Sequence, residues 1–242
     1  MPVLEAKSIT HIFPDGTAAL EGISLRIQDG EFVVIAGANG SGKTVFLRHL
    51  NGLLTPTKGE VLLDGEPIAK NISAARRRIG LIFQNSESQF VGQTVAEEVA
   101  FGPENLRAPR AEVERIVREC LEDVELESFR TQSPHALSGG QQRKLAIAGV
   151  LAMKPDIIMF DEPFTALDYP GVVQVLQQLV RLHQRGHTII LATHELEKVL
   201  AHAQRLVVFH KGKVAEDSTP EEVLERVENY GVHRPCIMTW LK

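Results

Sequence analysis

The sequence predicts an α/β fold, with a parallel sheet that carries helices on both faces, an antiparallel β region at the N-terminus and a helical insert. Three observations predict it. Short apolar runs divided by turn signals fill the first ~80 residues. Glu and Arg then dominate from about 85 to 150, with helical spacing of apolar residues. After Lys154-Pro155, apolar runs alternate with helical patterns, which is typical of a parallel sheet.

Composition limits the classes of protein that the chain can be. Its 242 residues, 43% hydrophobic and 24% charged, are typical of one large globular domain or two small ones. A net charge of −5 predicts no nucleic-acid partner, for which a basic surface would be expected. Cys120 and Cys236 are too few and too far apart for a disulfide framework or a zinc pattern. The start, MPVLEAKSIT, is not typical of a signal peptide, and no apolar run approaches the ~20 residues of a membrane span.

The strand-rich N-terminal region leads into one buried strand and a helix. Turn signals stand at 14–16, 29–30 and 64–65. Residues 32–36 form a continuous apolar run of the buried-strand type. The apolar residues from Val45 to Leu54 then predict a helix that ends before Thr55-Pro56.

The remaining elements follow from periodicity and capping signals. Apolar spacing over 110–124 predicts an amphipathic helix within the insert. Further along, the pattern predicts a strand at 156–160, a helix at 172–183 closed by Gly186, a strand at 188–192, a hairpin over 205–216 and a last helix opened by a capping box from Thr219 to Glu222.

The glycine-rich loop after the buried strand fits the pattern G-x-x-x-x-G-K-[ST]. Glycines let a backbone wrap a phosphate without Cβ clashes, and consecutive N–H groups can converge on the anion. Lys43 would bridge the β- and γ-phosphates, and the Thr44 hydroxyl would bind Mg²⁺. The alternative is a glycine-rich turn beside a solvated lysine. The predicted loop comprises Gly37, Ala38, Asn39, Gly40, Ser41, Gly42, Lys43 and Thr44.

Two carboxylates end the strand IIMFDE at 157–162. Asp161 stands where a carboxylate can hold Mg²⁺, and Glu162 could accept a proton from an attacking water. The alternative is an ordinary acidic strand end.

Two further polar residues follow apolar runs. His194 could hold the attacking water and Glu162 in line, although a lone histidine is more often structural. Gln84 could touch Mg²⁺ or the water, although on its own it is a surface glutamine.

LSGGQ at 137–141 is a second possible anion site, because a serine and two glycines precede a helical stretch. Ser138 is predicted as its N-cap. The alternative is a capped helix with a flexible entry.

In order and spacing, these motifs resemble those of the ATP-binding cassette (ABC) ATPases over roughly residues 3–225. The resemblance implies a P-loop NTPase with a RecA-like core, as one nucleotide-binding domain spanning 1–242. Core segments 1–84 and 155–242 would flank the helical insert, ~85–154. GANGSGKT resembles Walker A, Gln84 the Q-loop, LSGGQ the signature, IIMFDEP Walker B, Asp168 the D-loop and His194 the switch histidine.

The family resemblance implies a reason for two phosphate loops. In such ATPases two subunits pack head to tail, and the signature of one closes over the ATP held by the other. Ser138, Gly139, Gly140 and Gln141 would then serve a partner's nucleotide, in a homodimer or a heterodimer with a similar ATPase. The implied ligands are ATP and Mg²⁺, with the metal held by Thr44, Gln84 and Asp161.

A finer resemblance is to the ATPase subunits of energy-coupling factor (ECF) importers, including the cobalt and nickel branch. Their sequences contain motifs similar to three segments of this chain: FQNSESQF at 83–90, TVAEEVAFG at 94–102 and FPDGT at 13–17. The resemblance implies that Phe13 stacks on adenine, although it could simply pack in the β region. It also implies a transmembrane coupling protein beside the Q-loop, a membrane protein that captures a vitamin or metal ion, and a peripheral position on the cytoplasmic side of the membrane. Glu97 and Glu98 could receive Arg residues of the coupling protein or form a solvated helix face.

Two other functions compete with import. A soluble ABC ATPase could act as a switch in DNA repair, translation or iron–sulfur assembly, but the chain has one cassette and no heptad insert. A small-molecule kinase would leave LSGGQ unexplained.

Overall fold

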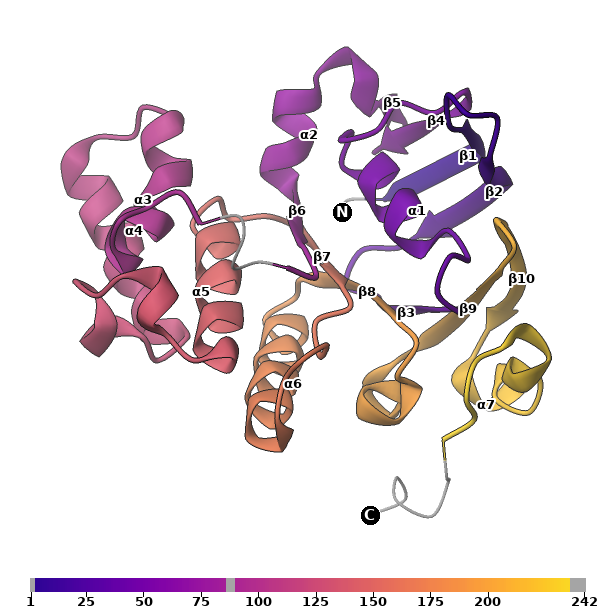
Figure 1. Cartoon of the computed structure of the whole chain (residues 1–242). Coiled ribbons are helices and arrows are strands. Elements are labelled where there is room, and N and C mark those ends of the chain that lie inside the picture. Colours follow the sequence, from indigo (N-terminus) through magenta and orange to yellow (C-terminus); the bar gives the residue numbers. More distant parts are fainter. Residues whose placement is uncertain (1–2, 86–89, 236–242) are drawn as a thin grey trace.

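The computed structural model describes residues 3–85 and 90–235. Figure 1 shows two sheets, with the helical insert at one side and the antiparallel sheet at the other. The six-stranded sheet has the order β10-β9-β3-β8-β7-β6, and the four-stranded sheet has the order β2-β1-β4-β5. The first sheet is parallel except for β10, which pairs antiparallel with β9, and the second is antiparallel. Both sheets agree with the predicted fold class.

The strands and α-helices have the following bounds. The strands are β1 (Leu4–Ile12), β2 (Ala18–Ile27), β3 (Phe32–Ala36), β4 (Lys58–Leu63), β5 (Glu66–Pro67), β6 (Ile79–Ile82), β7 (Ile157–Asp161), β8 (Thr188–Thr193), β9 (Arg205–His210) and β10 (Lys213–Ser218). The helices are α1 (Lys43–Leu50), α2 (Ile72–Arg78), α3 (Val95–Asn105), α4 (Arg110–Asp123), α5 (Gly139–Leu151), α6 (Tyr169–Gln184) and α7 (Pro220–Val223).

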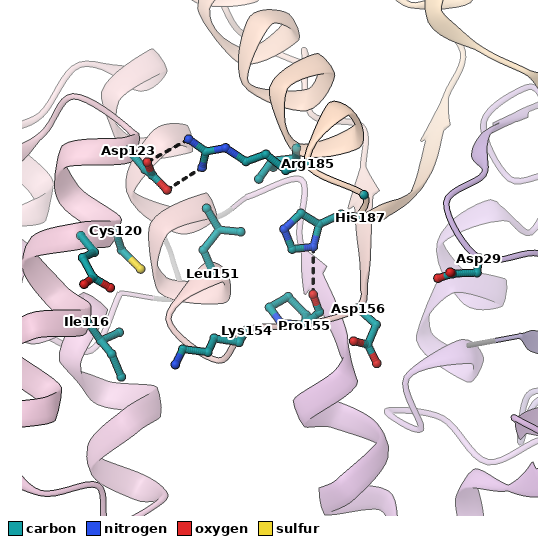
Figure 2. A pocket seen from close by; sticks show the side chains of 13 residues that line it. Asp29, Ile116, Cys120, Asp123, Leu151, Lys154, Pro155, Asp156, Arg185 and His187 are labelled. Carbon is teal, nitrogen blue, oxygen red and sulfur yellow. Dashed lines mark hydrogen bonds and ion pairs between the residues drawn. The ribbon is translucent and has the colours of Figure 1, made fainter. Parts of the chain in front are cut away.

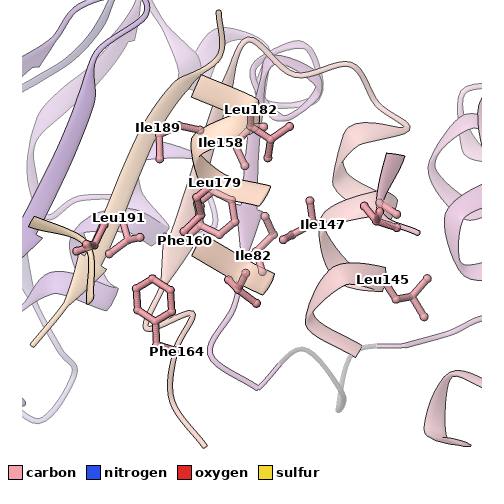
Figure 3. Close-up of a cluster of buried hydrophobic side chains, with 14 of the residues drawn as sticks. Ile82, Leu145, Ile147, Ile158, Phe160, Phe164, Leu179, Leu182, Ile189 and Leu191 are labelled. Atoms are coloured by element: carbon pink, nitrogen blue, oxygen red, sulfur yellow. The ribbon is translucent and has the colours of Figure 1, made fainter. Parts of the chain in front are cut away.

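Both faces of the parallel sheet are covered, because alternate residues of each strand enter two different cores. In β3, Phe32 and Val34 join the core shared with the insert and α6, whereas Val33 and Ile35 join the core shared with α1 and the antiparallel sheet. Figure 3 shows the first core, in which Phe160 of β7 lies among side chains of α5, α6 and β8. Side chains alternate across a strand, so a strand buried on both faces is apolar throughout, as predicted for 32–36.

The parallel register brings the carboxyl ends of three strands to one edge. Ala36 at the end of β3 pairs with Thr193, and Asp161 at the end of β7 pairs with Ala192. The glycine-rich loop, the acidic pair and His194 all follow these positions, so the topology gathers them at the same edge.

The helical insert also meets the core at the opposite end of the strands. Arg185, just after α6, donates two hydrogen bonds to Asp123 at the end of α4, at 2.6 and 3.1 Å. His187 contacts the Pro155 carbonyl at 2.9 Å, and these residues line a hollow of about 450 Å³ (Figure 2). None of the predicted site residues lines this hollow.

Three local predictions need correction. α1 ends at Leu50 rather than Leu54, because Gly52 takes a φ of +71° and the N–H groups of Leu53 and Leu54 both bond to the Arg48 carbonyl. α6 begins at Tyr169, because the Asp168 side chain caps it by accepting from Gly171 N at 3.0 Å. The capping box at Thr219 is absent and α7 has only four residues; the Glu222 carboxylate accepts from the Ser218 hydroxyl instead.

Other local predictions are confirmed. The helix predicted at 110–124 is α4, with Val113, Ile116, Val117 and Cys120 buried. The hairpin of β9 and β10 turns at Lys211-Gly212. Within residues 3–85 and 90–235, no helix combines the length and hydrophobicity needed to cross a bilayer.

Two buried histidines join β1 to α1. The rings of His11 and His49 lie 4.8 Å apart, centroid to centroid, and His49 Nδ1 donates to the Leu54 carbonyl at 3.0 Å. Burial lowers the pKa of His49 to about 4, against the opposing effect of that hydrogen bond.

We expect His49 to make the fold acid-sensitive. Its folded-state pKa lies below the unfolded value of 6.5, so the unfolded chain binds the proton first and stability falls as pH drops from about 6.5 to 4. In urea unfolding, His49→Gln should reduce that loss by about 2 to 3 kcal/mol, because it removes the group while keeping a donor for Leu54. His135→Gln, at an exposed histidine, is the control. An acid limb that is equally steep in both variants would contradict the assignment.

Candidate functional site

The glycine-rich loop has a backbone that only glycine tolerates at two positions. A Cβ on Gly37 would lie 2.5 Å from the Phe209 carbonyl oxygen. At Gly42, where φ is +107°, a Cβ would lie 2.8 Å from the Ala19 carbonyl oxygen. α1 begins directly after Gly42, so its free N–H groups and positive dipole end face the loop.

Lys43 folds back over this loop. Its Nζ donates to the carbonyls of Gly37 and Ala38, at 2.7 and 3.3 Å, and lies 3.5 Å from Glu162 Oε1. The side chain is only 5% exposed. A buried ammonium over a glycine-rich loop supplies the positive charge that a polyphosphate requires.

Thr44 and Asp161 form the second contact between the loop and β7. The Thr44 hydroxyl donates to Asp161 Oδ1 at 3.0 Å. Burial raises the pKa of Asp161, with a contribution from neighbouring Glu162, while the Thr44 hydrogen bond acts in the opposite direction. A hydroxyl beside a poorly solvated carboxylate is a suitable donor set for Mg²⁺.

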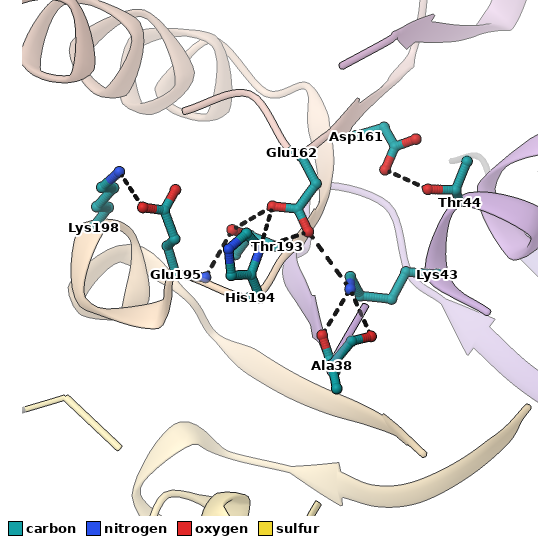
Figure 4. A network of polar contacts seen from close by, with 10 residues as sticks. Ala38, Lys43, Thr44, Asp161, Glu162, Thr193, His194, Glu195 and Lys198 are labelled. Carbon is teal, nitrogen blue, oxygen red and sulfur yellow. Dashed lines mark hydrogen bonds and ion pairs between the residues drawn. The ribbon is translucent and has the colours of Figure 1, made fainter. Parts of the chain in front are cut away.

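Glu162 is held by three side chains, as Figure 4 shows. Besides Lys43, the Thr193 hydroxyl donates to Oε2 at 3.2 Å, and His194 Nδ1 lies 3.0 Å from both carboxylate oxygens. Glu162 also has a left-handed backbone, with a φ of +49°, fixed by its N–H bond to the Ala192 carbonyl. Such strain in a non-glycine residue is common at functional sites.

Gln84 lies after β6, with an exposed side chain. In the described part of the chain, no hydrogen bond joins its amide to Thr44 or Asp161, so the predicted metal set is only partly assembled.

Arg143 of α5 connects this segment to the signature helix, and no motif predicted a role for it. Its Nη1 donates to the carbonyls of Phe83 and Gln84, at 2.9 and 2.5 Å, and its Nη2 donates to the Thr165 carbonyl at 3.4 Å. Only a basic residue two positions after LSGGQ could have drawn attention to it.

The signature residues occupy a different place from the Lys43 loop. Ser138 caps α5 through a capping box, with Gln141 N donating to its hydroxyl and the Gln141 side chain accepting from Ser138 N at 2.9 Å. Ser138, Gly139 and Gly140 line a hollow of about 360 Å³ together with Asp168. No residue of 37–44 lines that hollow.

Phe13 lies at the turn between β1 and β2, 37% exposed. Its ring meets the His11 ring edge to face, with centroids 4.8 Å apart. Its other surface is therefore open to a planar ligand.

The residues fit ATP and Mg²⁺. The loop forms a backbone cradle from which side chains are excluded, and the buried Ser41 hydroxyl has no hydrogen-bond partner among the described residues. Thr44 and Asp161 add oxygen donors beside it.

The loop, the acidic strand end and the sheet define a P-loop nucleotide-binding protein. A family model described as "ABC transporter" matches residues 20–165. The chain belongs to the ABC transporter family, and it is an ATPase of that family.

Individual relatives share most of the chain. It is 44% identical to an energy-coupling factor transporter ATP-binding protein EcfA of Methanocaldococcus jannaschii, over 94% of this chain and 83% of that protein. It is 45% identical to a putative ABC transporter ATP-binding protein of Halobacterium salinarum, over 96% and 100%. Among solved structures, it resembles cbiO1 of Clostridium perfringens, part of the complex cbiONQ, with a TM-score of 0.84, 35% identity and coverage of 93% and 92%. The dimeric cassette MJ0796 has a TM-score of 0.80 and 32% identity, with coverage of 89% and 98%.

Arg143→Met should destabilise the fold. It would leave three main-chain carbonyls without their charged donor, at a cost of about 2 to 3 kcal/mol in the free energy of unfolding. Urea titration measures this cost. Arg118→Met, on the exposed face of α4, should cost less than about 0.5 kcal/mol. Equal stability of the two variants would contradict the bridging role.

Lys43→Ala should abolish tight ATP binding, because it removes the ammonium that lies over the loop. Isothermal titration with Mg²⁺-ATP measures the affinity. Lys70→Ala, at an exposed lysine of the antiparallel region, should bind as the parent chain does. Retained affinity in the Lys43 variant would argue against this loop as the phosphate site.

Proposed function

We propose that the chain is the ATP-hydrolysing subunit of an ECF-type importer and works as a head-to-tail dimer. One observation carries the proposal: the hydrolytic groups converge around Lys43, whereas the signature glycines line a separate hollow. A single chain thus holds two unlike half-sites, and a two-fold pair of chains would complete both. The partner is a second copy or a similar ATPase.

Each residue of the first half-site has a task. Lys43 and the N–H groups of the loop hold the β- and γ-phosphates, and Phe13 stacks on adenine. Thr44 and Asp161, joined by Gln84 once its side chain swings inward, would hold Mg²⁺, which supplies charge neutralisation at the phosphates.

Glu162 accepts the proton of the attacking water. Its carboxylate lies between Lys43 and His194, and the contacts with these two side chains orient it. His194 donates its Nδ1 proton to that carboxylate and thereby holds it in line with the water.

The second half-site acts on the partner's nucleotide. Gly139 and Gly140 open α5, so their N–H groups and the helix dipole can face a γ-phosphate from across the interface. Asp168 lies in the same hollow. Hydrolysis removes the phosphate that joins the two chains, and the dimer reopens.

The dimer's motion would drive a transmembrane coupling protein seated beside the Q-loop, with the chain on the cytoplasmic side of the membrane. A separate membrane protein would capture the cargo, a vitamin or a transition-metal ion. The similarity to an EcfA protein and to cbiO1 supports this assignment over a soluble switch protein.

The two acidic residues after the Q-loop have local partners. Glu98 Oε2 accepts from the N–H groups of Val91 and Gly92, at 2.8 and 2.9 Å. Glu97 Oε2 accepts from Gln93 and Thr94, at 2.8 and 3.1 Å. Reversing both charges would therefore disturb the 91–94 segment as well as any membrane contact, so it is not a clean test of partner binding.

Glu162→Gln should trap a closed, ATP-bound dimer with turnover reduced about 100-fold or more, because the amide cannot accept the proton. Phosphate release and light scattering with Mg²⁺-ATP measure both effects. Glu195→Gln, at the neighbouring acidic residue that pairs with Lys198, is the control and should hydrolyse normally. Near-normal turnover of the Glu162 variant would remove it from the base role.

The importer assignment is tested by co-purification. Expressed with the membrane proteins of its own source, the chain should pellet with membranes and carry a multi-span membrane protein through affinity purification in detergent. Lys43→Ala should still do so if docking is separate from nucleotide binding. A chain that remains in the soluble fraction with no membrane partner would favour the switch alternative.

A further inference from the structure

Three aromatic rings form a continuous stack from the β1–β2 turn to α1. The Phe13 ring meets the His11 ring at 84°, with centroids 4.8 Å apart, and the His11 ring meets the His49 ring at 60°, also at 4.8 Å. The stack runs from the surface into the core, because Phe13 is 37% exposed, His11 9% and His49 1%. Its inner end belongs to α1, the helix that begins with Lys43 and Thr44.

The backbone around Phe13 is held by the turn. The Phe13 N–H donates to the Thr17 carbonyl, and the Gly16 N–H donates to the Phe13 carbonyl, both at 2.9 Å. These bonds fix the main chain but do not determine how the Phe13 side chain is rotated. In the described part of the chain, the aromatic ring that contacts this side chain is that of His11.

His11 is itself held on two sides. Its backbone pairs with Leu20 of β2, and its ring packs on that of His49. His49 is fixed in turn, because it is buried and its Nδ1 donates to the Leu54 carbonyl at 3.0 Å. His11 Nδ1 and His49 Nε2 have no hydrogen-bond partner among the described residues. Ring contacts, rather than a hydrogen bond between the two side chains, therefore join the histidines.

We propose that His11 is a positioning residue for the base of the nucleotide, because its ring sets the tilt of Phe13 relative to α1. The stack then fixes the spacing between two parts of the site, the adenine surface of Phe13 and the phosphate loop at the start of α1. Rigid positioning of a stacking ring strengthens binding, because less side-chain freedom is lost when the base packs on it. The inference rests on the proposed function, because it takes Phe13 as the residue that stacks on adenine.

The experiment separates binding of the base from binding of the phosphates. Isothermal titration measures dissociation constants for Mg²⁺-ATP and for Mg²⁺-tripolyphosphate, which has no base. The variants are His11→Leu, His11→Phe, Phe13→Ala and the double variant that combines His11→Leu with Phe13→Ala. His183→Leu is the matched control, because the His183 ring also meets a phenylalanine ring edge to face, that of Phe32 at 5.4 Å and 82°, in the core shared with α6.

The single variants should affect the two ligands differently. Phe13→Ala should weaken Mg²⁺-ATP binding about tenfold or more, because it removes the stacking surface. His11→Leu should weaken it about two- to tenfold, because it removes an edge-to-face contact. His11→Phe keeps a flat ring and should bind ATP as the parent chain does. All of these variants should bind tripolyphosphate as the parent chain does, since the phosphate loop is unchanged.

The double variant and the kinetics test whether His11 acts through Phe13. The double variant should bind ATP no more weakly than Phe13→Ala does, because the tilt of a deleted ring has no effect. In His11→Leu, the KM for ATP should rise while kcat stays unchanged, because the hydrolytic groups are not touched. His183→Leu should leave both dissociation constants unchanged, even where it destabilises the fold.

Three results would each overturn the inference: parent-like ATP binding by His11→Leu, an equal loss of tripolyphosphate binding in that variant, or additive losses in the double variant. ATP binding by His11→Phe that is as weak as that of His11→Leu would also overturn it, because the ring would then not be the cause. If Phe13→Ala itself bound ATP as the parent chain does, the stacking role in the proposed function would fail first.

Discussion

A carboxylate that is buried away from water needs partners that stabilise its negative charge. The partners of Glu162 organise the nucleotide site. Lys43 reaches Glu162 from the start of α1, and Thr193 and His194 reach it from the end of β8, so two separate elements hold the carboxylate. The left-handed backbone of Glu162 turns the side chain toward them rather than along the strand.

The insert also contacts the core at the same edge of the sheet. Arg143 is a polar link there, because its guanidinium holds two carbonyls that follow β6 and one that follows β7. At the far end, the Asp123–Arg185 pair lies on the surface and contributes less. Polar contacts therefore join the insert to the core at both ends of the strands.

The fold class could be predicted from the sequence because its signals are local. The buried strand at 32–36, the amphipathic helix at 110–124 and the loop 37–44 each depend on a few consecutive residues. The strand order could not be predicted, because it depends on which distant segments pair. Leu53 and Leu54 continued the apolar period but lie past the end of α1, since Gly52 takes a conformation that ends the helix. The capping box predicted at Thr219 does not form, because the Glu222 carboxylate accepts a hydrogen bond from the Ser218 hydroxyl instead.

Some site residues could likewise be predicted from local motifs, whereas others depend on contacts between distant segments. Lys43, Thr44, Asp161, Glu162 and His194 were predicted from motifs and meet in the structure. Arg143 was not assigned a role, because its carbonyl partners lie about 60 and 22 positions away and no motif marks them. The engagement of Glu97 and Glu98 with the 91–94 backbone also depends on loop geometry that composition does not reveal.

The separation of the 138–140 hollow from the Lys43 loop has a consequence for where ATP is hydrolysed. If every productive encounter needs two molecules, the rate per molecule rises with their density and is low in dilute solution. Copies gathered on one membrane assembly meet at a high effective molarity, whereas stray copies rarely meet. ATP would then be hydrolysed chiefly by copies that are bound to a transport complex.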